Sequence, residues 1–452
     1  MRASGTSETS MAATPSIPVN VKYRLFRAEL KGRLAALTTG GSLPPGDLTP
    51  PDPTAETDRF RLVKMAERHG PVFRAWVHGK PQTCICDPQL AQKVFTENRQ
   101  HLRTATVDMT RLFATGILRN MEGEDHSTYR RAFAAAFRSI SREDLESATD
   151  EPFRDSLEKL RASSGPLDSG NLAFAMKRLT TRILFRLILG LHPDEEADSE
   201  LEALFNRFAP NGLPIVMPKK QKDGYAEVRR LYLKRIEREG VFAPSLRAWF
   251  DENGELDETV IGNLLSTTEL VRHDVHGYWR WLILELSGKP DVMDEIAASR
   301  DRDHRRRLAG AAAYETLRMH QTEFLRRVTS KTLRVGDYVI PAGTGIMFCT
   351  WVHHRNPDVF DCPHAFEPSR FADEAPDWKK LIPFGMDHHR CPGAGWTVDL
   401  SEILVERLAD EFTLQCLEYG KPRLASFHFE TGRDSLIGLA PRNCAPEKRQ
   451  AG

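Results

Sequence analysis

Cys391, near the C-terminal end of the chain, has the chemistry of a metal ligand. It follows a turn-rich segment, 384–390, and directly precedes a helical pattern of apolar residues that includes Val398 and Leu400. A thiol at a helix N-terminus faces unpaired backbone N–H groups and the positive end of the helix dipole, which lower its pKa and favour the thiolate. The Gly-Ala-Gly run at 393–395 would let a flat macrocycle approach the backbone. The pattern predicts either a metal-ligating thiolate or a buried structural cysteine.

The residues around Cys391 resemble the haem-binding loop of the cytochrome P450 superfamily, which reads Phe-Gly-x-Gly-x-(Arg/His)-x-Cys-x-Gly. The fixed positions of that loop are occupied here by Phe384, Gly385, His389, Cys391 and Gly393. Asp387 stands where the family usually has a second glycine, so we expect a different turn at that point. Aspartate tolerates a left-handed backbone, which makes the departure compatible with the loop.

Two arginines and two histidines match the family's ligands for the haem propionates. His126 and Arg130 are four residues apart and therefore share one helix face. In the family this pair binds a propionate, a task that suits arginine because its planar fork can donate two charge-assisted hydrogen bonds to one carboxylate. By family spacing back from 340–341, Arg327 is the second propionate-binding arginine, and His389 is another propionate donor.

A third set of matches predicts a structural ion cluster. Glu315 and Arg318 form the family's Glu-x-x-Arg motif, whose spacing places both side chains on one helix face. Residues 354–371 match the family's His-Arg-x-Pro-x-x-Phe-x-x-Pro-x-x-Phe-x-Pro-x-Arg-Phe at nearly every fixed position, and Arg370 in that stretch would complete the cluster. If the cluster is buried, we expect it to specify geometry more than it adds stability.

Together the matches run in the family's order from residue 121 to about 410, which is most of the chain. The resemblance implies a mainly α (α+β) cytochrome P450 fold, a single domain over residues 21–452 in which a large helical part with small β-sheets buries haem b. It implies that Cys391 is the axial thiolate of the haem iron, an arrangement that favours O–O cleavage. Phe324, Leu325 and Leu270 would border the substrate side of that haem.

The resemblance also implies an activity and a redox partner. The activity is that of a haem-thiolate monooxygenase that oxidises a small organic or biosynthetic (secondary-metabolite) substrate with O2. No flavin or iron–sulfur motif is fused to the chain, so electrons would come from a ferredoxin or flavodoxin with its reductase. The family's partner docks on the cysteine side of the haem, where this chain offers Arg130, Arg131, His388 and Arg390.

The central helix departs from the family. A helical pattern runs from about residue 257 to 286, and family members carry Ala-Gly-x-(Asp/Glu)-Thr near its middle. Counting back from Gly-Lys-Pro at 288–290 aligns that motif with Leu-Val-Arg-His-Asp at 270–274. His273 then takes the position of the acid and Asp274 that of the alcohol.

We expect His273 and Asp274 to be catalytic, because imidazole and carboxylate groups can carry protons near neutral pH once their environment shifts their pKa values. Asp274, steadied by His273 or Arg272, would relay protons or anchor a polar group of the substrate. The alternative is that these charges lie on the solvated side of the helix. A second functional class also stays open, a haem-thiolate protein without ordinary O2 activation: a peroxide-driven enzyme, a dehydratase or isomerase, or a non-catalytic binding protein.

Composition bounds the class of protein. Lys+Arg and Asp+Glu both number 63, a balance that gives no support for a nucleic-acid partner. The seven cysteines are irregularly spaced in a chain of 452 residues, which favours a reducing compartment over a disulfide framework. No apolar run approaches the roughly 20 residues of a spanning helix, and no signal peptide is recognisable. We therefore expect a cytoplasmic protein of the soluble bacterial kind, without a membrane anchor.

For residues 1–86 the sequence predicts a disordered tail, a helix and a β-hairpin. Residues 1–20 lack periodicity and are expected to be disordered. Residues 21–37 form a basic amphipathic helix that either touches a membrane surface or packs on its own domain. Two alternating runs, 72–77 and 81–86, flank His-Gly-Lys and predict a β-hairpin.

The rest of the chain predicts a large helical block with small sheets. Helical patterns dominate from residue 87 almost to 320, with irregular breaks near residues 99–120 and 209–218. A second strand-rich patch covers 332–347. The loops near 99–120 and 205–220 are expected to line the substrate pocket. Their sequences do not indicate which substrate binds there.

Two competing sites fit the sequence less well. His353, His354, Cys362 and His364 could be read as zinc ligands, but proline and aromatic residues fill the gaps and no Cys-x-x-Cys accompanies them. A nucleophilic pair of Cys391 with a histidine lacks a recognisable signature. The absence of Cys-x-x-Cys-His excludes a covalent c-type haem.

Overall fold

The computed structural model describes residues 17–104, 117–119, 121–162, 165–189, 196–208, 219–236, 249, 256–321, 324–425 and 428–442. The expected disordered tail lies mostly outside these residues, and the first described helix begins at Val19. Most of the two expected pocket loops, near residues 99–120 and 205–220, also lies outside them.

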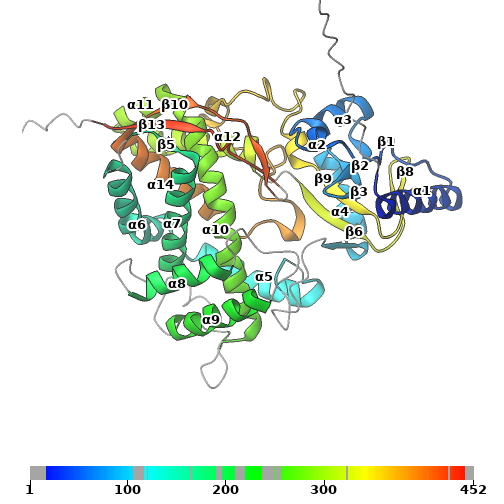
Figure 1. The fold of residues 1–452 in the computed structure, drawn as a ribbon, viewed down its shortest axis with the longest axis horizontal. Coiled ribbons are helices and arrows are strands. Elements are labelled where there is room, and N and C mark those ends of the chain that lie inside the picture. Colours follow the sequence, from blue (N-terminus) through cyan, green and yellow to red (C-terminus); the bar gives the residue numbers. More distant parts are fainter. Residues whose placement is uncertain are drawn as a thin grey trace, which may run out of the picture.

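Helices form one large block, and most strands gather beside it (Figure 1). The helices are α1 (Val19–Thr39), α2 (Pro53–Glu56), α3 (Arg61–His69), α4 (Pro88–Asn98), α5 (Gly123–Arg138), α6 (Arg142–Ala162), α7 (Ser169–Leu184), α8 (Glu196–Phe208), α9 (Lys219–Ile236), α10 (Glu258–Ser287), α11 (Pro290–Ala298), α12 (Arg302–His320), α13 (Thr350–His353) and α14 (Ala394–Glu411). The expected mainly α architecture with small sheets is confirmed.

The strands form one larger sheet and three small ones. Their bounds are β1 (Gly46–Asp47), β2 (Val72–Val77), β3 (Lys80–Ile85), β4 (Leu102–Thr104), β5 (Leu167–Asp168), β6 (Leu325–Thr329), β7 (Leu333–Val335), β8 (Tyr338–Ile340), β9 (Gly345–Phe348), β10 (Phe412–Glu418), β11 (Arg423–Ala425), β12 (His428–Glu430) and β13 (Leu436–Pro441). The larger sheet has the order β1-β2-β3-β9-β6-β4, and the small sheets are β10-β13-β5, β11-β12 and β7-β8.

The predicted hairpin is β2–β3, with Val77 opposite Lys80. Its two turn residues, His78 and Gly79, have φ values of 49° and 74°. Positive φ at both central positions is the geometry of the tight turn that matches the twist of two antiparallel strands. The hairpin adds β3 to β9 in parallel, so it attaches the N-terminal part of the chain to strands that follow the helical block.

Helix α10 runs through the middle of the helical block (Figure 1). Asp257 caps it, because its carboxylate accepts the N–H of Thr259 at 2.6 Å. Every residue from 278 to 287 is buried, as expected of a helix surrounded by protein on all sides. It packs against α7 and α12, so its position determines which residues of its middle face the neighbouring elements.

The predicted ion cluster ties α12 to the loop after α13. Glu315 and Arg318 are fully buried, and the Nε and Nη2 atoms of Arg318 each donate to one carboxylate oxygen at 2.7 Å. Nε of Arg370 lies 3.3 Å from Oε1 of Glu315. Arg318 also donates to the backbone carbonyls of His354, Pro363 and Ala365, at 2.8, 2.8 and 3.0 Å. The buried Glu315–Arg318 pair thus fixes the backbone path of the loop after α13. This agrees with the expectation that the cluster specifies geometry more than it adds stability.

A second buried network holds His320 as a neutral imidazole. Its Nδ1 lies 3.2 Å from Nη1 of Arg59, which can only donate, so Nε2 carries the proton and donates to Glu285 at 2.6 Å. The ring also stacks on Trp281 with 3.9 Å between centroids. Because a second proton would face Arg59 in a buried site, the pKa of His320 falls from 6.5 to about 3, with burial the largest cause.

We expect the free energy of unfolding to fall as the pH drops from 6.5 towards 3. The pKa of His320 is about 3 in the folded protein and returns to 6.5 on unfolding, so the unfolded chain binds more protons in this range. At pH 5 this residue alone would cost about 2 kcal/mol relative to pH 8. Chemical denaturation at both pH values tests this, with His320→Gln as the comparison. The loss should be smaller in the variant, and equal losses in the two proteins would contradict the assignment.

Candidate functional site

Cys391 lies in a loop that closes on itself before α14. Its backbone N–H donates to the carbonyl of Phe384 at 2.9 Å, and Gly385 has a φ of 78°, which glycine adopts without strain. Asp387 begins a short 3₁₀ helix, Asp387–His389, and is not among the non-glycine residues with positive φ in the described part of the chain. The different turn that the sequence predicts is therefore a 3₁₀ segment, and it does not use the left-handed backbone that aspartate tolerates.

The pKa of the Cys391 thiol is raised, and burial is the largest cause. A backbone hydrogen bond at Gly393, the residue before α14, lowers it as a helix N-terminus should, but this effect is smaller. The prediction that the pKa of this cysteine is lowered is therefore wrong for the free thiol, because burial outweighs the effect of the helix N-terminus. A metal ion that binds the sulfur has to displace its proton.

Cys391 and Asp274 of α10 face one enclosed space. Both side chains are accessible to solvent, yet burial is the largest cause of the raised pKa at each of them. Side chains that are accessible while protein surrounds them line an internal hollow. The carboxylate of Asp274 also raises the pKa of Cys391, which places the two groups within electrostatic reach of each other.

The carboxyl group of Asp274 has no hydrogen-bond or ion-pair partner among the residues described above. Three cationic groups act on it electrostatically and lower its pKa against the effect of burial: Arg119 most, then His428, then His273. Burial outweighs these three groups, so the pKa of Asp274 is raised. A carboxyl group in this state favours any ligand that supplies a hydrogen-bond donor or a positive charge.

The direction in which Asp274 points follows from two contacts on the same face of α10. Asn263 and Trp281 lie eleven residues before and seven after it, and both spacings are close to whole turns. The side-chain carbonyl of Asn263 accepts the N–H of Leu118 at 2.5 Å, and Nε1 of Trp281 donates to the carbonyl of Phe429 in β12 at 3.3 Å. Residues 117–119 and strand β12 therefore cross this face on either side of Asp274.

Neighbouring charges on α10 form a separate cluster. Arg272 is fully buried, and its Nε and Nη2 atoms donate to Oε2 of Glu269 at 3.1 and 2.7 Å. Nε2 of His273 lies 2.8 Å from the other oxygen of Glu269. Arg272 also reaches the carbonyl of Phe205 on α8 at 3.4 Å. Glu269 is not among the residues predicted from the sequence. Glu269 lies three residues before Arg272 and four before His273, a spacing that places all three on one helix face.

Four residues expected to bind propionates gather beside the Cys391 loop. The rings of His126 and His389 lie 4.4 Å apart between centroids. Burial, followed by the positive groups Arg327, His388, His126 and Arg130, lowers the pKa of His389 to about 2. These side chains come from α5, β6 and the loop itself. Such a set of convergent donors favours a carboxylate as its ligand.

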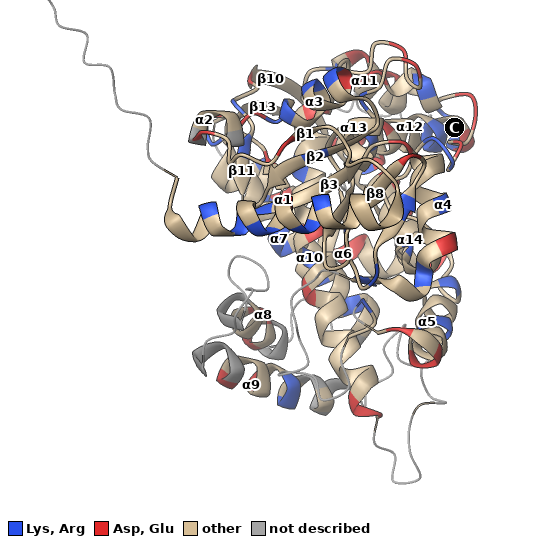
Figure 2. Ribbon diagram, turned by 90° about the vertical axis from the view of Figure 1, so that its right-hand side faces the viewer, with Lys and Arg blue, Asp and Glu red and all other residues tan. Residues whose placement is uncertain are grey.

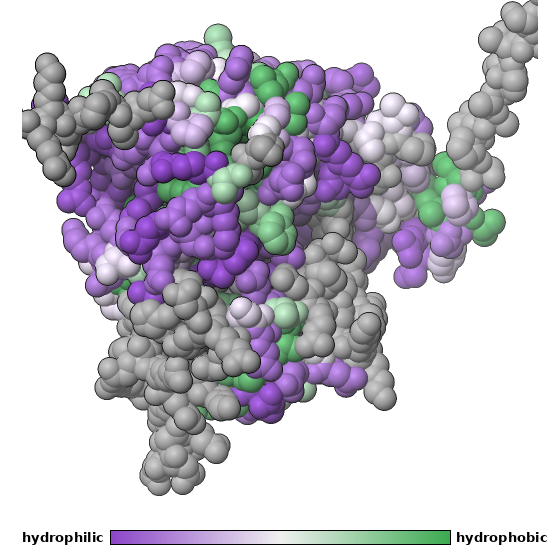
Figure 3. Space-filling model, turned by 60° about the vertical axis from the view of Figure 1, so that its left-hand side comes forward, coloured by the Kyte–Doolittle hydropathy of each residue, from purple (hydrophilic) through white to green (hydrophobic). Residues whose placement is uncertain are grey.

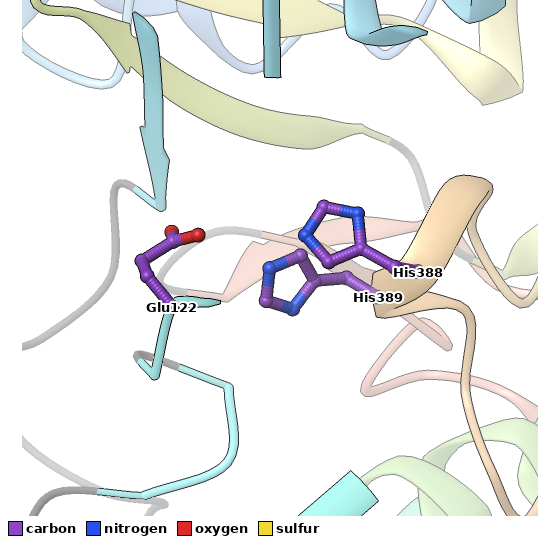
Figure 4. Close-up of side chains that lie close together, drawn as sticks. All are labelled: Glu122, His388 and His389. Atoms are coloured by element: carbon purple, nitrogen blue, oxygen red, sulfur yellow. The ribbon is translucent and has the colours of Figure 1, made fainter. Parts of the chain in front are cut away.

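Figure 4 shows Glu122, at the start of α5, close to the imidazoles of His388 and His389. One possible ligand atom from each lies within 4.8 Å of the others, a spacing that a divalent metal ion could close. The ring of His388 also packs edge-on against His126 at 5.2 Å. The two imidazoles therefore belong to the same cluster of histidines and arginines as His126 and do not form a separate site.

These residues fit a haem with a thiolate ligand. A cysteine sulfur faces an enclosed space, and donors for carboxylates converge at one edge of the same loop. Gly393 follows the cysteine closely, and a Cβ there would lie 3.2 Å from the ring of Phe137, so the loop packs closely against α5 at this point.

The residues expected to border the substrate lie in different surroundings. Leu270, one turn before Asp274, is half-buried on the same face of α10. Leu325 lies beside the cysteine loop, where a Cβ on Gly385 would come within 3.4 Å of it. Phe324 packs on His78 of the β2–β3 turn, with 4.8 Å between ring centroids.

Two of the three histidines of the zinc interpretation form hydrogen bonds with the backbone. Nε2 of His353 lies 2.9 Å from the carbonyl of Lys380. Nε2 of His354 accepts the N–H of Ile382 at 2.9 Å in a fully buried position. These contacts connect α13 to the segment that leads to the cysteine loop.

Comparison with known proteins identifies the family. The model of the family described as Cytochrome P450 matches residues 55–211 and 280–428. The unmatched residues between these ranges include the first two-thirds of α10, where the sequence departs from the motif of the resemblance.

Curated relatives and solved structures agree with this match. The chain is 27% identical over 386 residues to Putative cytochrome P450 138 of Mycobacterium tuberculosis, covering 79% of this chain and 86% of that protein. It is 23% identical to Abscisic acid 8'-hydroxylase 1 of Oryza sativa, covering 81% of this chain and 84% of the relative.

Among solved structures, retinoic acid-bound cyanobacterial CYP120A1 superposes with a TM-score of 0.71 at 18% identity, covering 89% of this chain and 100% of that one. A variant of cytochrome P450 OleT in complex with arachidonic acid superposes with a TM-score of 0.70 at 17% identity, covering 86% and 96%. The fold that carries the cysteine loop is thus the cytochrome P450 fold. The chain belongs to the cytochrome P450 family, whose members are monooxygenase-type oxidoreductases that bind haem through a cysteine thiolate.

Proposed function

We propose that this protein is a haem-thiolate monooxygenase in which Cys391 is the iron ligand and Asp274 faces the substrate. The observation that carries the proposal is the position of the two side chains. Each is accessible to solvent although burial is the largest cause of its raised pKa, and the Asp274 carboxylate raises the pKa of Cys391. Bound haem would supply the activation of O2. The chain's own residues would hold the cofactor, exclude water and orient a small organic substrate, of the kind oxidised in secondary metabolism.

The cluster of histidines and arginines beside the cysteine loop would bind the haem propionates. His126, Arg130, Arg327 and His389 offer donors from three separate elements. Burial is the largest cause of the low pKa of His389, and repulsion from Arg327, His388, His126 and Arg130 adds to it. A propionate at this point would remove that repulsion, and Arg327 and Arg130 would bind it with charge-assisted hydrogen bonds. Gly393 and Phe384 would shape the loop below the macrocycle.

A ferredoxin or flavodoxin would deliver electrons on the cysteine side. Arg131 and Arg390 are exposed there, and Arg130 donates to the carbonyl of Arg390. An exposed basic surface steers an acidic partner to the loop, an effect that weakens with salt. Turnover that requires NAD(P)H, ferredoxin and reductase would separate this function from a peroxide-driven one, which needs no electron partner.

His273 would act as a positioning residue, because its imidazole is paired with Glu269 and its charge acts on Asp274. Asp274 itself would anchor a polar or cationic group of the substrate or relay protons to the site of oxygen chemistry. The two roles differ in what they require. An anchor contributes to ligand affinity, whereas a relay contributes to turnover alone.

Replacement of the cysteine tests the assignment of the iron ligand. We expect Cys391→Ser to lose the thiolate signature from the spectrum of its reduced carbon monoxide complex, because serine cannot supply a soft anionic sulfur. The exposed Cys362→Ser is the matched control and should keep that signature. A thiolate spectrum that persists in Cys391→Ser would disprove the assignment.

The propionate group is tested through cofactor retention. Arg130→Ala and Arg327→Ala should each weaken haem binding roughly tenfold, because each leaves a propionate without a charge-assisted hydrogen bond. Haem transfer to an acceptor protein gives the dissociation rate. Arg131→Ala, one position away on α5 and exposed, serves as the control. The assignment fails if the double variant loses haem no faster than this control.

Asp274→Asn separates the anchor from the relay. We expect the native protein to bind a quaternary ammonium ligand more tightly than its tert-butyl isostere, since neither can ligate iron and only one carries charge. In an anchor, Asp274→Asn should abolish this preference, a change of about tenfold or more. In a relay, ligand affinities stay equal while turnover falls and hydrogen peroxide release rises. If affinity, turnover and peroxide release all match the native protein, Asp274 has neither role.

A further inference from the structure

Helix α1 exposes an apolar stripe along its whole length. Six large hydrophobic side chains are between 46% and 82% exposed, far more than the core residues of the protein. They are Val19, Tyr23, Phe26, Leu30, Leu34 and Leu37. At 3.6 residues per turn, all six fall within an arc of about 80° on the helix surface.

The stripe is not the face by which α1 packs on the rest of the protein. Gly32 is the buried residue of the helix, and a Cβ there would come within 2.9 Å of Leu43. The helix also contacts strand β8. Gly32 lies on the side of the helix opposite the stripe, so α1 packs on its own domain with one face and presents apolar side chains with the other.

Basic residues border the stripe on both sides. Figure 2 shows Lys and Arg along α1, and Figure 3 shows green hydrophobic atoms gathered where this helix projects from the body. The basic residues are Lys22, Arg24, Arg27, Lys31 and Arg33, and the one acidic residue of the helix, Glu29, is paired with Arg74 at 2.9 Å. The exposed face is therefore apolar in the middle and cationic at its margins.

This arrangement selects one kind of partner. In the described part of the chain, no helix combines the length and apolar character that crossing a bilayer requires. A second copy packed stripe to stripe would bring two sets of basic residues together, which opposes the association. An anionic lipid surface buries the apolar side chains and pairs with both rows of cations.

We propose that α1 is a membrane-surface helix that lies in the interface of an anionic lipid bilayer and holds the enzyme there. Phe26 and Leu30 occupy the middle of the stripe and would enter the acyl boundary. Arg24, Arg27 and Lys31 would lie at the level of the headgroups. The enzyme would thereby be concentrated at the surface where apolar substrates partition.

The test is binding of the full-length, haem-loaded protein to vesicles of phosphatidylcholine, with or without phosphatidylglycerol. The anionic vesicles should bind the protein. Salt at 0.5 M should weaken that binding, because the Debye length, about 10 Å at 0.1 M salt, becomes shorter as salt is added. Phe26→Gln with Leu30→Gln, and separately Arg24→Gln with Arg27→Gln, should each weaken binding about tenfold or more. Phe174→Gln is the matched control, because Phe174 is an aromatic residue of helix α7 whose exposed fraction, 67%, is close to the 64% of Phe26.

Any of the following results would overturn the proposal. The first is no binding to anionic vesicles. The second is equal binding to neutral and anionic vesicles, or equal losses in the α1 variants and in Phe174→Gln. The third is a dimer in gel filtration that disappears in the Phe26→Gln, Leu30→Gln variant without any vesicle binding, which would assign the stripe to a second copy.

Discussion

The removal of charged groups from water is the constraint on which this structure depends most. Glu315 with Arg318, and Glu269 with Arg272, are fully buried, and each carboxylate has its arginine within hydrogen-bond distance. A buried charge without a partner would cost several kcal/mol, so these pairs fix the positions of the helices and loops that carry them. Asp274 departs from the rule, because it is surrounded by protein and shares an enclosed space with Cys391.

The two sides of that space depend on different parts of the fold. The cysteine loop is closed by the hydrogen bond from the Cys391 N–H to the carbonyl of Phe384 and leads directly into α14. The segment before the loop is held by His353 and His354. The face of α10 opposite is crossed by residues 117–119 and by β12. In the proposed function, one wall would bind the haem iron and the haem propionates, and the other would present the carboxyl group of Asp274 to the ligand.

Much of the fold could be predicted from the sequence, because its signals are local or lie in a fixed order. The hairpin, the limits of α10 and the Glu315–Arg318–Arg370 group follow from turn residues, helical spacing and motif order. The pKa of Cys391 could not be predicted, since burial by distant segments outweighs the helix N-terminus. The partner of His273 could have been predicted, because Glu269 lies four residues before it on the same helix face. The contact of Arg272 with the carbonyl of Phe205 on α8 could not, because it joins distant parts of the chain.

The central claim is that Cys391 and Asp274 lie on opposite faces of one bound haem. The most direct test is a crystal structure of the haem-loaded protein. The account predicts a bond between the Cys391 sulfur and the iron, the propionates at His126, Arg130, Arg327 and His389, and the Asp274 carboxylate on the face away from the sulfur. An iron bound by another side chain, or an Asp274 carboxylate outside the haem cavity, would contradict it.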